Sequence, residues 1–209
     1  MKDLVIVGAS GFGREVAQYV EDINKVTPRW NLLGFIDDNP NALDGVKCDY
    51  KVIGSIQDWE PHNEDYVCAL AFPHVKEKMV QLLEERGAVF VSLIHPLSRV
   101  SRDACIGKGL IMTPYSNINT NAKVGDFVTI LSSGIGHDAE VGSFSTLSGH
   151  CSINGHVKIG KSVYMGCNAC IAPSKKIGDN VVIGMGSVVV SNVKEGTKVF
   201  GNPAKRILL

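Results

Sequence analysis

The stretch VGSFSTLSGHCSINGHVKIGKSVYMGCNACIAPSKKIGDNVVIGMGSVV spans residues 141–189 and carries an aliphatic side chain at every sixth position. The same period extends back to Val100, with one step of five residues between Ile130 and Ile135. A period of six is typical of a parallel β-helix, in which each hexad is a short strand plus a corner and three hexads make one coil of about 18 residues. The predicted inward side chains are Val100, Ile106, Met112, Ile118, Val124, Ile130, Ile135, Val141, Leu147, Ile153, Ile159, Met165, Ile171, Ile177, Ile183 and Val189.

Small residues accompany this period. Many positions four residues after an inward side chain hold Ala, Ser or Gly, as a narrow interior requires. Glycines directly follow several inward side chains, and we expect the chain to turn tightly there. These glycines are Gly107, Gly125, Gly142, Gly160, Gly166, Gly178 and Gly184. The left-handed sense of the coil is taken from the hexapeptide class of β-helices, against the usual right-handed preference of parallel crossovers.

The first 94 residues have a different pattern, in which short apolar runs alternate with segments whose apolar residues have helical spacing. Alternating strands and helices predict a small parallel sheet, a short version of a doubly wound fold. The expected strands lie near residues 4–8, 31–38, 66–72 and 88–96, and the expected helices near 13–23 and 75–87. The predicted class is therefore α/β + β: a Rossmann-like domain over 1–94, a left-handed parallel β-helix over 95–194 and a tail over 195–209.

Composition excludes several kinds of partner. The 209 residues contain 21 Lys plus Arg and 21 Asp plus Glu, so no net charge favours nucleic acid or an anionic membrane. No apolar run approaches the roughly 20 residues that span a bilayer, and the N-terminus does not resemble a signal peptide. We expect a cytoplasmic protein. Cys167 and Cys170 have the spacing of a metal or redox pair, but without a second pair they are interpreted as small apolar residues.

A glycine loop, GASGFG over residues 8–13, follows the first strand and opens the first helix. Amide groups in such a loop can bind phosphate, and Arg14 in the first helical turn could pair with it. The predicted substrate-binding residues are Gly8, Ser10, Gly11, Gly13 and Arg14, with Asp37 and Asp38 at the end of the second strand. The order is GxxGxG and not the GxGxxG of dinucleotide-binding enzymes, so an NAD-dependent oxidoreductase is the weaker interpretation.

Six motifs in this order give the chain a recognisable family pattern: VIVGASGFGREVA (5–17), GFIDD (34–38), LIHPLSRVS (93–101), IGHDAEVG (135–142), NGHVKIG (154–160) and VFGNPAKRI (199–207). The sequence resembles the hexapeptide-repeat acyltransferases of the sialic-acid O-acetyltransferase and bacillosamine N-acetyltransferase type. The resemblance implies an N-terminal domain that holds a sugar nucleotide and a β-helix that binds acetyl-CoA. It also implies a homotrimer with active sites between neighbouring prisms.

The chemistry of acetyl transfer needs a base, a donor for the oxyanion and a means of positioning the thioester. The family pattern places its catalytic histidine at His137, and an imidazole titrates where a general base works best. Asp138 could orient that ring, provided that the two residues lie at a corner, because consecutive strand residues face opposite sides. Gly155 matches the family position whose backbone N–H faces the thioester carbonyl. Thr146 stands where relatives often carry a second histidine near the coenzyme.

Lys205, with Arg206, could meet the phosphates of the coenzyme. A second departure from the family pattern is the sequence Ala71-Phe72-Pro73 after the third strand, where relatives often have a glycine and a polar residue. This bulkier, less polar wall implies that the sugar or base recognised differs from that of the relatives.

Two acetylation reactions remain open. N-acetylation of a nucleotide-linked amino sugar for surface glycans is the first interpretation, and O-acetylation of sialic acid or a related sugar is the second. A zinc site on His137, His150 and His156 is disfavoured because their spacings do not match stacked coils, so no metal is expected. A purely structural β-helix would show a regular ladder of threonines, which the sequence lacks.

Overall fold

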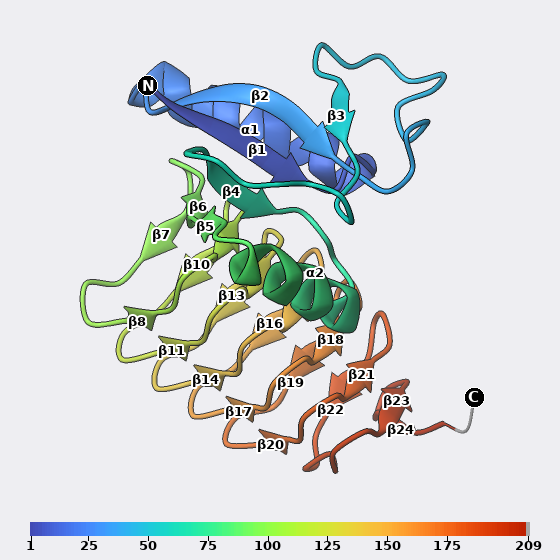
Figure 1. Ribbon diagram of the computed structural model, residues 1–209. Helices are drawn as coiled ribbons and strands as arrows, with labels where there is room; N and C mark the ends of the chain where they lie inside the picture. Colours follow the sequence, from blue (N-terminus) through green and yellow to red (C-terminus); the bar gives the residue numbers. More distant parts are fainter. Residues whose placement is uncertain (208–209) are drawn as a thin grey trace. The chain divides into compact units, whose positions relative to one another are not determined.

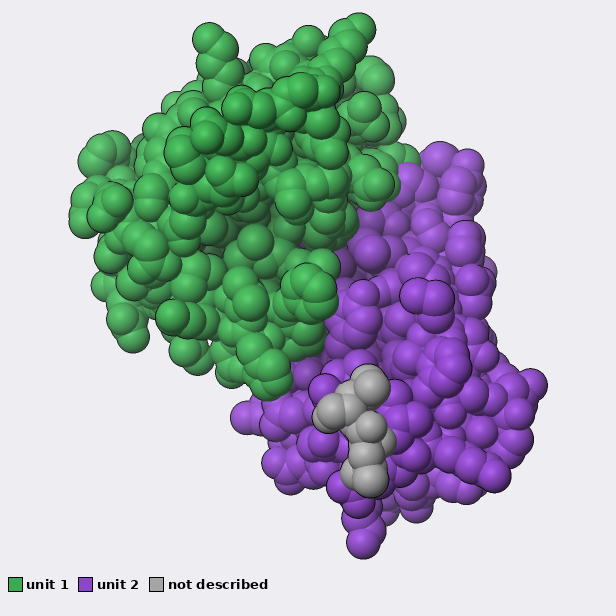
Figure 2. Space-filling view, turned by 90° about the vertical axis from the view of Figure 1, so that its right-hand side faces the viewer, with its two compact units in different colours: residues 1–96 green, residues 97–209 purple. Residues whose placement is uncertain are grey.

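The computed structural model describes residues 1–207, so Leu208 and Leu209 of the predicted tail lie outside the described residues. The chain divides into two compact units, one formed by residues 1–96 and one that begins at Leu97, drawn in green and purple in Figure 2. This division falls close to the predicted boundary after residue 94. None of the helices in the described part is long and apolar enough to cross a membrane.

The first unit is built on a five-stranded parallel sheet in the order β3-β2-β1-β4-β5 (Figure 1). Its central strand contributes Leu4, Val5, Ile6 and Val7, all fully buried, as expected for a parallel sheet covered on both faces. The elements are β1 (Lys2–Val7), α1 (Gly11–Val26), β2 (Trp30–Ile36), β3 (Val52–Gly54), β4 (Asp65–Cys68), α2 (Pro73–Glu85), β5 (Val89–Phe90) and β6 (Leu93–Ile94). The predicted parallel sheet is confirmed.

Two details of this unit differ from the sequence prediction. The strand β3 is only three residues long, too short for a pattern of alternation to reveal it. The strand expected over 88–96 is interrupted after Phe90, which leaves β5 and β6 as two separate pairs of residues. Short strands are recognised by their neighbours in the sheet, and these are known only once the chain is folded.

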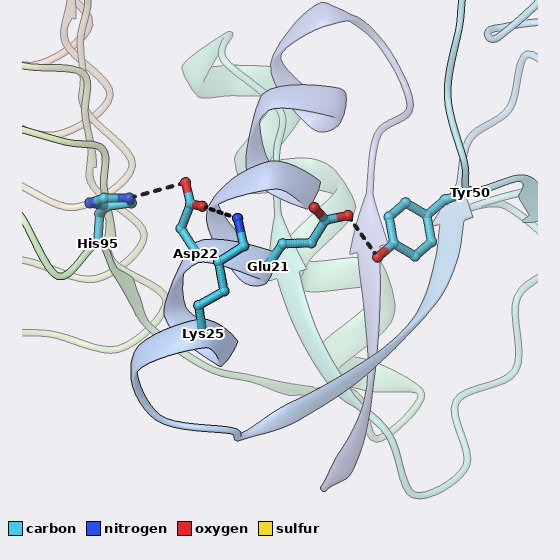
Figure 3. A network of polar contacts seen from close by, with 5 residues as sticks. All are labelled: Glu21, Asp22, Lys25, Tyr50 and His95. Atoms are coloured by element: carbon cyan, nitrogen blue, oxygen red, sulfur yellow. Dashed lines mark hydrogen bonds and ion pairs between the residues drawn. The ribbon is translucent and has the colours of Figure 1, made fainter.

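Figure 3 shows a polar network along α1. The Asp22 carboxylate accepts a hydrogen bond of 2.9 Å from Lys25 and lies 3.5 Å from the Nε2 atom of His95. The hydrogen bond from Lys25 is the first cause that lowers the pKa of Asp22. The His95 ring is buried and meets the Tyr19 ring edge-on at 5.6 Å. These contacts hold the last residues of the first unit against the helix that opens at the glycine loop.

The second unit is a triangular prism of two- and three-residue strands, stacked along three faces and parallel except for the last strand, β24 (Figure 1). We name its faces A (β7, β10, β13, β16, β19, β22), B (β8, β11, β14, β17, β20) and C (β9, β12, β15, β18, β21, β23, β24). The strands are β7 (Arg99–Val100), β8 (Cys105–Ile106), β9 (Ile111–Met112), β10 (Asn117–Ile118), β11 (Lys123–Val124), β12 (Thr129–Ile130), β13 (Gly134–Ile135), β14 (Glu140–Val141), β15 (Thr146–Leu147), β16 (Ser152–Ile153), β17 (Lys158–Ile159), β18 (Tyr164–Met165), β19 (Cys170–Ile171), β20 (Lys176–Ile177), β21 (Val182–Ile183), β22 (Val188–Val189), β23 (Lys198–Phe200) and β24 (Lys205–Arg206).

Every predicted inward residue is the second residue of one of the strands β7 to β22, and most are buried. The left-handed parallel β-helix is therefore confirmed. The five-residue step shortens one coil: Thr129 pairs with Ile111, 18 residues earlier, but with Thr146, 17 residues later. The missing residue is at the corner after Ile130. There the residue with positive φ is Ser132, two residues after Ile130, whereas at the next corner it is Asp138, three residues after Ile135.

The expected reason for the glycines after the inward residues is wrong. The positive φ falls two positions after these glycines, where five of the seven residues are not glycine, for example Phe144 at 62° and Ser162 at 53°. The glycines are needed because the next coil stacks directly above them. A Cβ atom at Gly142 would lie 2.4 Å from the carbonyl of Gly160, and one at Gly160 would lie 2.1 Å from an Asp179 carboxylate oxygen. Coil stacking, and not the turn, excludes a side chain there.

A lysine is buried in the first unit. Lys76 of α2 is 1% exposed, and burial lowers the pKa of its amine from 10.5 to about 7. Burial likewise raises the pKa of the neighbouring Cys68 thiol to about 11. Between about pH 7 and 10.5 the unfolded chain binds more protons at Lys76 than the folded chain does, so this group makes stability rise with pH.

We predict that Lys76→Met removes this part of the pH dependence. The slope lost is up to about 1.4 kcal/mol per pH unit in the free energy of unfolding. Urea denaturation between about pH 7 and 9 measures it. The matched control is Lys78→Met on the exposed side of the same helix, for which the slope should equal that of the wild type. An unchanged slope in Lys76→Met would contradict the prediction.

Candidate functional site

The predicted base and its orienting acid lie at a corner of the β-helix, between faces A and B. His137 and Asp138 directly follow β13, and Asp138 has a φ of 57°. The left-handed residue breaks the strand alternation, so both side chains reach the outer edge of the prism. The Nδ1 atom of His137 lies 2.8 Å from the Oδ2 atom of Asp138. The contact that the sequence allowed only at a corner is therefore present in the structure.

Stacked corners bring two further side chains to the same carboxylate. Asn121, one coil below, donates a hydrogen bond of 3.2 Å to the Oδ1 atom of Asp138. His156, one coil above, places its Nε2 atom 3.9 Å from the Oδ2 atom. The hydrogen bond from His137 is the largest cause that lowers the pKa of Asp138, followed by that from Asn121. The acid therefore remains a carboxylate, which can only accept.

This arrangement favours one assignment of the two nitrogens in a neutral His137 ring. A carboxylate beside Nδ1 requires the proton on Nδ1, which leaves the lone pair on Nε2. The imidazole is 60% exposed, so the Nε2 side is accessible to a substrate. The sequence does not single out Asn121 as a site residue. Its spacing of one coil from Asp138, shortened by the five-residue step, is the signal that identifies it.

His137, Asp138 and His156 offer ligand atoms that all lie within 4.8 Å of one another, close enough to share a cation. The shortest of these contacts is a hydrogen bond, however, and a cation would have to replace its proton. The rings of the two histidines meet edge-on at 5.1 Å. The geometry is that of an acid–base pair with a second imidazole beside it. The absence of a metal remains a prediction.

Gly155 lies directly over the His137 ring. A Cβ atom at Gly155 would lie 2.6 Å from both Cε1 and Nε2 of that imidazole. The other glycines of the stack face mainly the backbone or side chains of the coil above, whereas this one makes room for the predicted base. Its position supports the assignment of the Gly155 backbone to the same site.

Thr146 and Lys205 lie on face C, away from the corner between faces A and B that carries His137 and Asp138. Thr146 is the first residue of β15 on face C and is fully buried, between Thr129 and Tyr164 in the ladder. Lys205 and Arg206 form β24, which pairs antiparallel with β23 at the end of face C and is exposed. Their contacts with the coenzyme stay predictions.

The glycine loop has the geometry expected of a phosphate-binding turn. Gly8 has a φ of 100°, and a Cβ atom at Gly13 would lie 2.0 Å from the Gly8 carbonyl oxygen, so both are needed for the strand-to-helix turn. Gly11, by contrast, has room for a side chain, with only an Arg14 nitrogen at 3.8 Å. The fold does not require glycine there. Ser10 is the N-cap residue of α1 and its side chain makes no capping bond. The first amides of a helix have no intrahelical acceptor, which leaves them for a ligand.

The two acids at the end of β2 are engaged by the protein itself. Asp37 accepts hydrogen bonds from the amides of Ala9 and Asn39, at 2.8 and 2.9 Å. Asp38 accepts from the hydroxyl of Ser55 and from the amide of Gln57, at 2.9 and 3.0 Å, and these bonds hold its pKa down although burial opposes them. The structure thus gives both carboxylates a local role in holding the loops. Their contact with a substrate stays a prediction.

A family model, curated proteins and solved structures all give matches to this chain. Residues 3–83 match the family described as PglD N-terminal domain. The chain is 30% identical to the GDP-perosamine N-acetyltransferase of Escherichia coli O157:H7, over 97% of this chain and 95% of that protein. The acetyltransferase domain of PglB from Neisseria gonorrhoeae FA1090, solved with acetyl coenzyme A, has a TM-score of 0.88 at 25% identity and 99% coverage of both chains.

PerB from Caulobacter crescentus, solved with CoA and GDP-perosamine, has a TM-score of 0.87 at 23% identity, over 99% of this chain and 98% of that one. This likeness supports the fold. Since the E. coli relative is 30% identical and is matched over nearly its whole length, the chain belongs to the hexapeptide-repeat sugar acyltransferases and is an acetyl-CoA-dependent acyltransferase.

Proposed function

We propose that this protein N-acetylates an amino sugar linked to a nucleotide, with acetyl-CoA as the donor and His137 as the general base. The observation that carries the proposal is the 2.8 Å contact between His137 Nδ1 and Asp138 Oδ2, which leaves Nε2 free to take a proton. The E. coli relative is named as acting on GDP-perosamine, an amino sugar nucleotide, and this supports the choice of substrate class.

The residues would act in the following order. Acetyl-CoA supplies an activated acetyl group as its thioester. His137 accepts a proton at Nε2 from the sugar amine as the amine nitrogen bonds to the thioester carbon. Asp138 stabilises the imidazolium that forms, as the carboxylate does in hydrolase triads. The Gly155 amide donates a hydrogen bond to the oxyanion. When the carbon–sulfur bond breaks, the imidazolium returns its proton to the leaving sulfur.

In the proposed assembly, three copies pack their prisms face to face, and the active site lies between neighbours. Flat faces of stacked strands are easily buried against copies of themselves by three-fold symmetry. Exposed apolar side chains on the prism, Met185 and Val190 among them, are 68% and 48% accessible in the single chain. Light scattering of the purified protein measures the assembly directly. The cytoplasmic location likewise remains a prediction.

A thiol-release assay with acetyl-CoA and a panel of nucleotide amino sugars and sialic acids tests the reaction. Release only with amino sugars, and a product resistant to hydroxylamine, indicates an amide. A product that hydroxylamine cleaves indicates an ester and supports the O-acetylation alternative. Absence of release with every acceptor in the panel would contradict the proposal.

We predict that His137→Ala lowers kcat by about 10² to 10⁴-fold, the usual contribution of a general base. The matched control is His150→Asn, at an exposed corner with a φ of 62° that Asn tolerates. This control should retain wild-type activity. Circular dichroism and light scattering verify that both variants fold and assemble alike. Full activity of His137→Ala would disprove the mechanism.

Asp138→Asn should also lower kcat, because a neutral amide neither stabilises the imidazolium nor holds the proton on Nδ1. The upper limit is the loss of about 10⁴-fold seen for the equivalent change in hydrolase triads. Asn accepts the left-handed backbone at this corner, so the fold should be unaffected. Because the pKa of Asp138 lies below its ordinary value, wild-type activity should not fall through protonation of this acid at neutral pH. An unchanged kcat would rule out its orienting role.

Gly155→Ala should displace the His137 ring, since the new methyl group would occupy space 2.6 Å from that ring. Displacement of a catalytic group by about 1 Å costs on the order of 10²-fold in rate. Gly149→Ala is the matched control, because its methyl group would meet only the Cys167 sulfur, at 3.9 Å. Steady-state kinetics should show a loss of kcat in the first variant alone. Equal activities would place Gly155 outside the site.

A further inference from the structure

Two imidazoles and one carboxylate converge at the corner between faces A and B. The Oδ2 atom of Asp138 lies 2.8 Å from Nδ1 of His137 and 3.9 Å from Nε2 of His156. All three of these atoms lie within 4.8 Å of one another. Neighbouring ligand atoms in a tetrahedral zinc site are about 3.3 Å apart, because each lies about 2.0–2.1 Å from the metal. The two contacts fall on either side of that separation, so rotations of these side chains can close the set around one ion.

The orientation of the rings and the backbone ladder suit a shared ion. The His137 and His156 rings meet edge-on, with 88° between their planes, and are not stacked. Each imidazole binds a metal in the plane of its ring, so two perpendicular rings can donate to one tetrahedral centre. The His156 amide donates a hydrogen bond of 3.0 Å to the His137 carbonyl, which fixes the two coils in register. Asn121 donates to the Oδ1 atom of Asp138, and this bond orients the carboxylate and leaves Oδ2 for a metal.

The cluster is open to an ion from solvent. The His137 and His156 side chains are 60% and 59% exposed, and that of Asp138 is 37% exposed. Two imidazoles and one carboxylate favour zinc over magnesium or calcium, which prefer oxygen ligands. Lys158, two residues after His156, forms its own ion pair of 3.0 Å with Glu140. The Asp138 carboxylate therefore keeps its negative charge for a metal.

We propose that this corner is an inhibitory zinc site, formed by His137 Nδ1, Asp138 Oδ2 and His156 Nε2. Without zinc, the proton of the neutral His137 ring lies on Nδ1, and the lone pair on Nε2 acts as the base. Zinc bonds to Nδ1, and the displaced proton passes through solvent to Nε2. The ring stays neutral but no longer has a free lone pair. Zinc thus removes the base and is not a cofactor of the transfer. The inhibition rests on the proposed function, since it requires His137 to be the base.

Titration of zinc chloride into the full protein, without acetyl-CoA or an acceptor, tests the site by calorimetry. We expect one ion per chain, and cobalt chloride should give the intense visible absorption of a four-coordinate ion whose fourth ligand is solvent. His156→Asn removes one imidazole and keeps a left-handed backbone that Asn tolerates. It should weaken zinc binding at least about tenfold, because loss of a mere supporting residue already costs that much. His150→Asn, at another exposed corner, is the matched control and should bind zinc like the wild type.

Acetyl transfer with and without zinc tests the inhibition. Saturating zinc should lower the wild-type kcat by about 10²-fold or more, the usual contribution of a general base, and EDTA should restore it. His156 takes no part in the proposed transfer, so His156→Asn should be active without zinc and stay active at zinc concentrations that inhibit the wild type. The acetylated product is measured by mass spectrometry, because zinc binds thiolates and would disturb a thiol assay.

Equal zinc affinities of the wild type and His156→Asn, or no binding of zinc to the wild type, would overturn the site. Zinc binding that leaves kcat unchanged would overturn the inhibition. Absence of acetyl transfer in the zinc-free wild type would instead contradict the proposed function. Calorimetry needs no acceptor and measures the metal site by itself, so the two failures are distinguishable.

Discussion

The close stacking of one coil on the next is the constraint on which the β-helix and its site depend. Each strand inside the stack pairs with its equivalents one coil below and one coil above, and the glycines after the inward residues leave no space for a Cβ between coils. The corners use residues in the left-handed conformation, most of them not glycine. Packing of inward aliphatic side chains compensates the strain that these corners carry. The backbone ladder therefore fixes the position of the outer corner at which the predicted base lies.

Rigid stacking explains how residues far apart in sequence meet at one carboxylate. Asn121, Asp138 and His156 occupy the same corner in three successive coils, and His137 and Gly155 are the residues that precede this corner in two of them. The backbone ladder determines where a side chain at such a corner lies, so the predicted acid–base pair needs little further support. The single five-residue step sets the register of every coil above it, including the one that carries His156.

In the first unit, some residues of the predicted binding motif are needed for the fold and others are not. Gly8 and Gly13 are required by the strand-to-helix turn itself, whereas Gly11 is not, and Asp37 and Asp38 hold loops together. The predicted binding motif thus includes residues that shape the turn and residues that are open to a ligand. Arg14 belongs to the second kind, because its buried Nε atom has no acceptor in the described chain. The sequence motif alone could not distinguish the residues that shape the turn from those open to a ligand, because both kinds are glycines and charged residues that follow a strand.

The six-residue period determined the β-helix and its inward side chains, because every hexad must bury one aliphatic group in the same narrow interior. Alternating apolar segments likewise determined the parallel sheet. The assignment of His137 as the base comes from the family motif around it and stays a prediction. Only the tertiary structure decided what depends on neighbours distant in sequence. It added β3, assigned the glycines to coil stacking, brought Asn121 to Asp138 and buried Thr146. The six-residue period predicts on which face of the prism a residue lies. Which residues meet between coils depends on the register of the stacked strands, and the shortened corner after Ile130 changes that register by one residue.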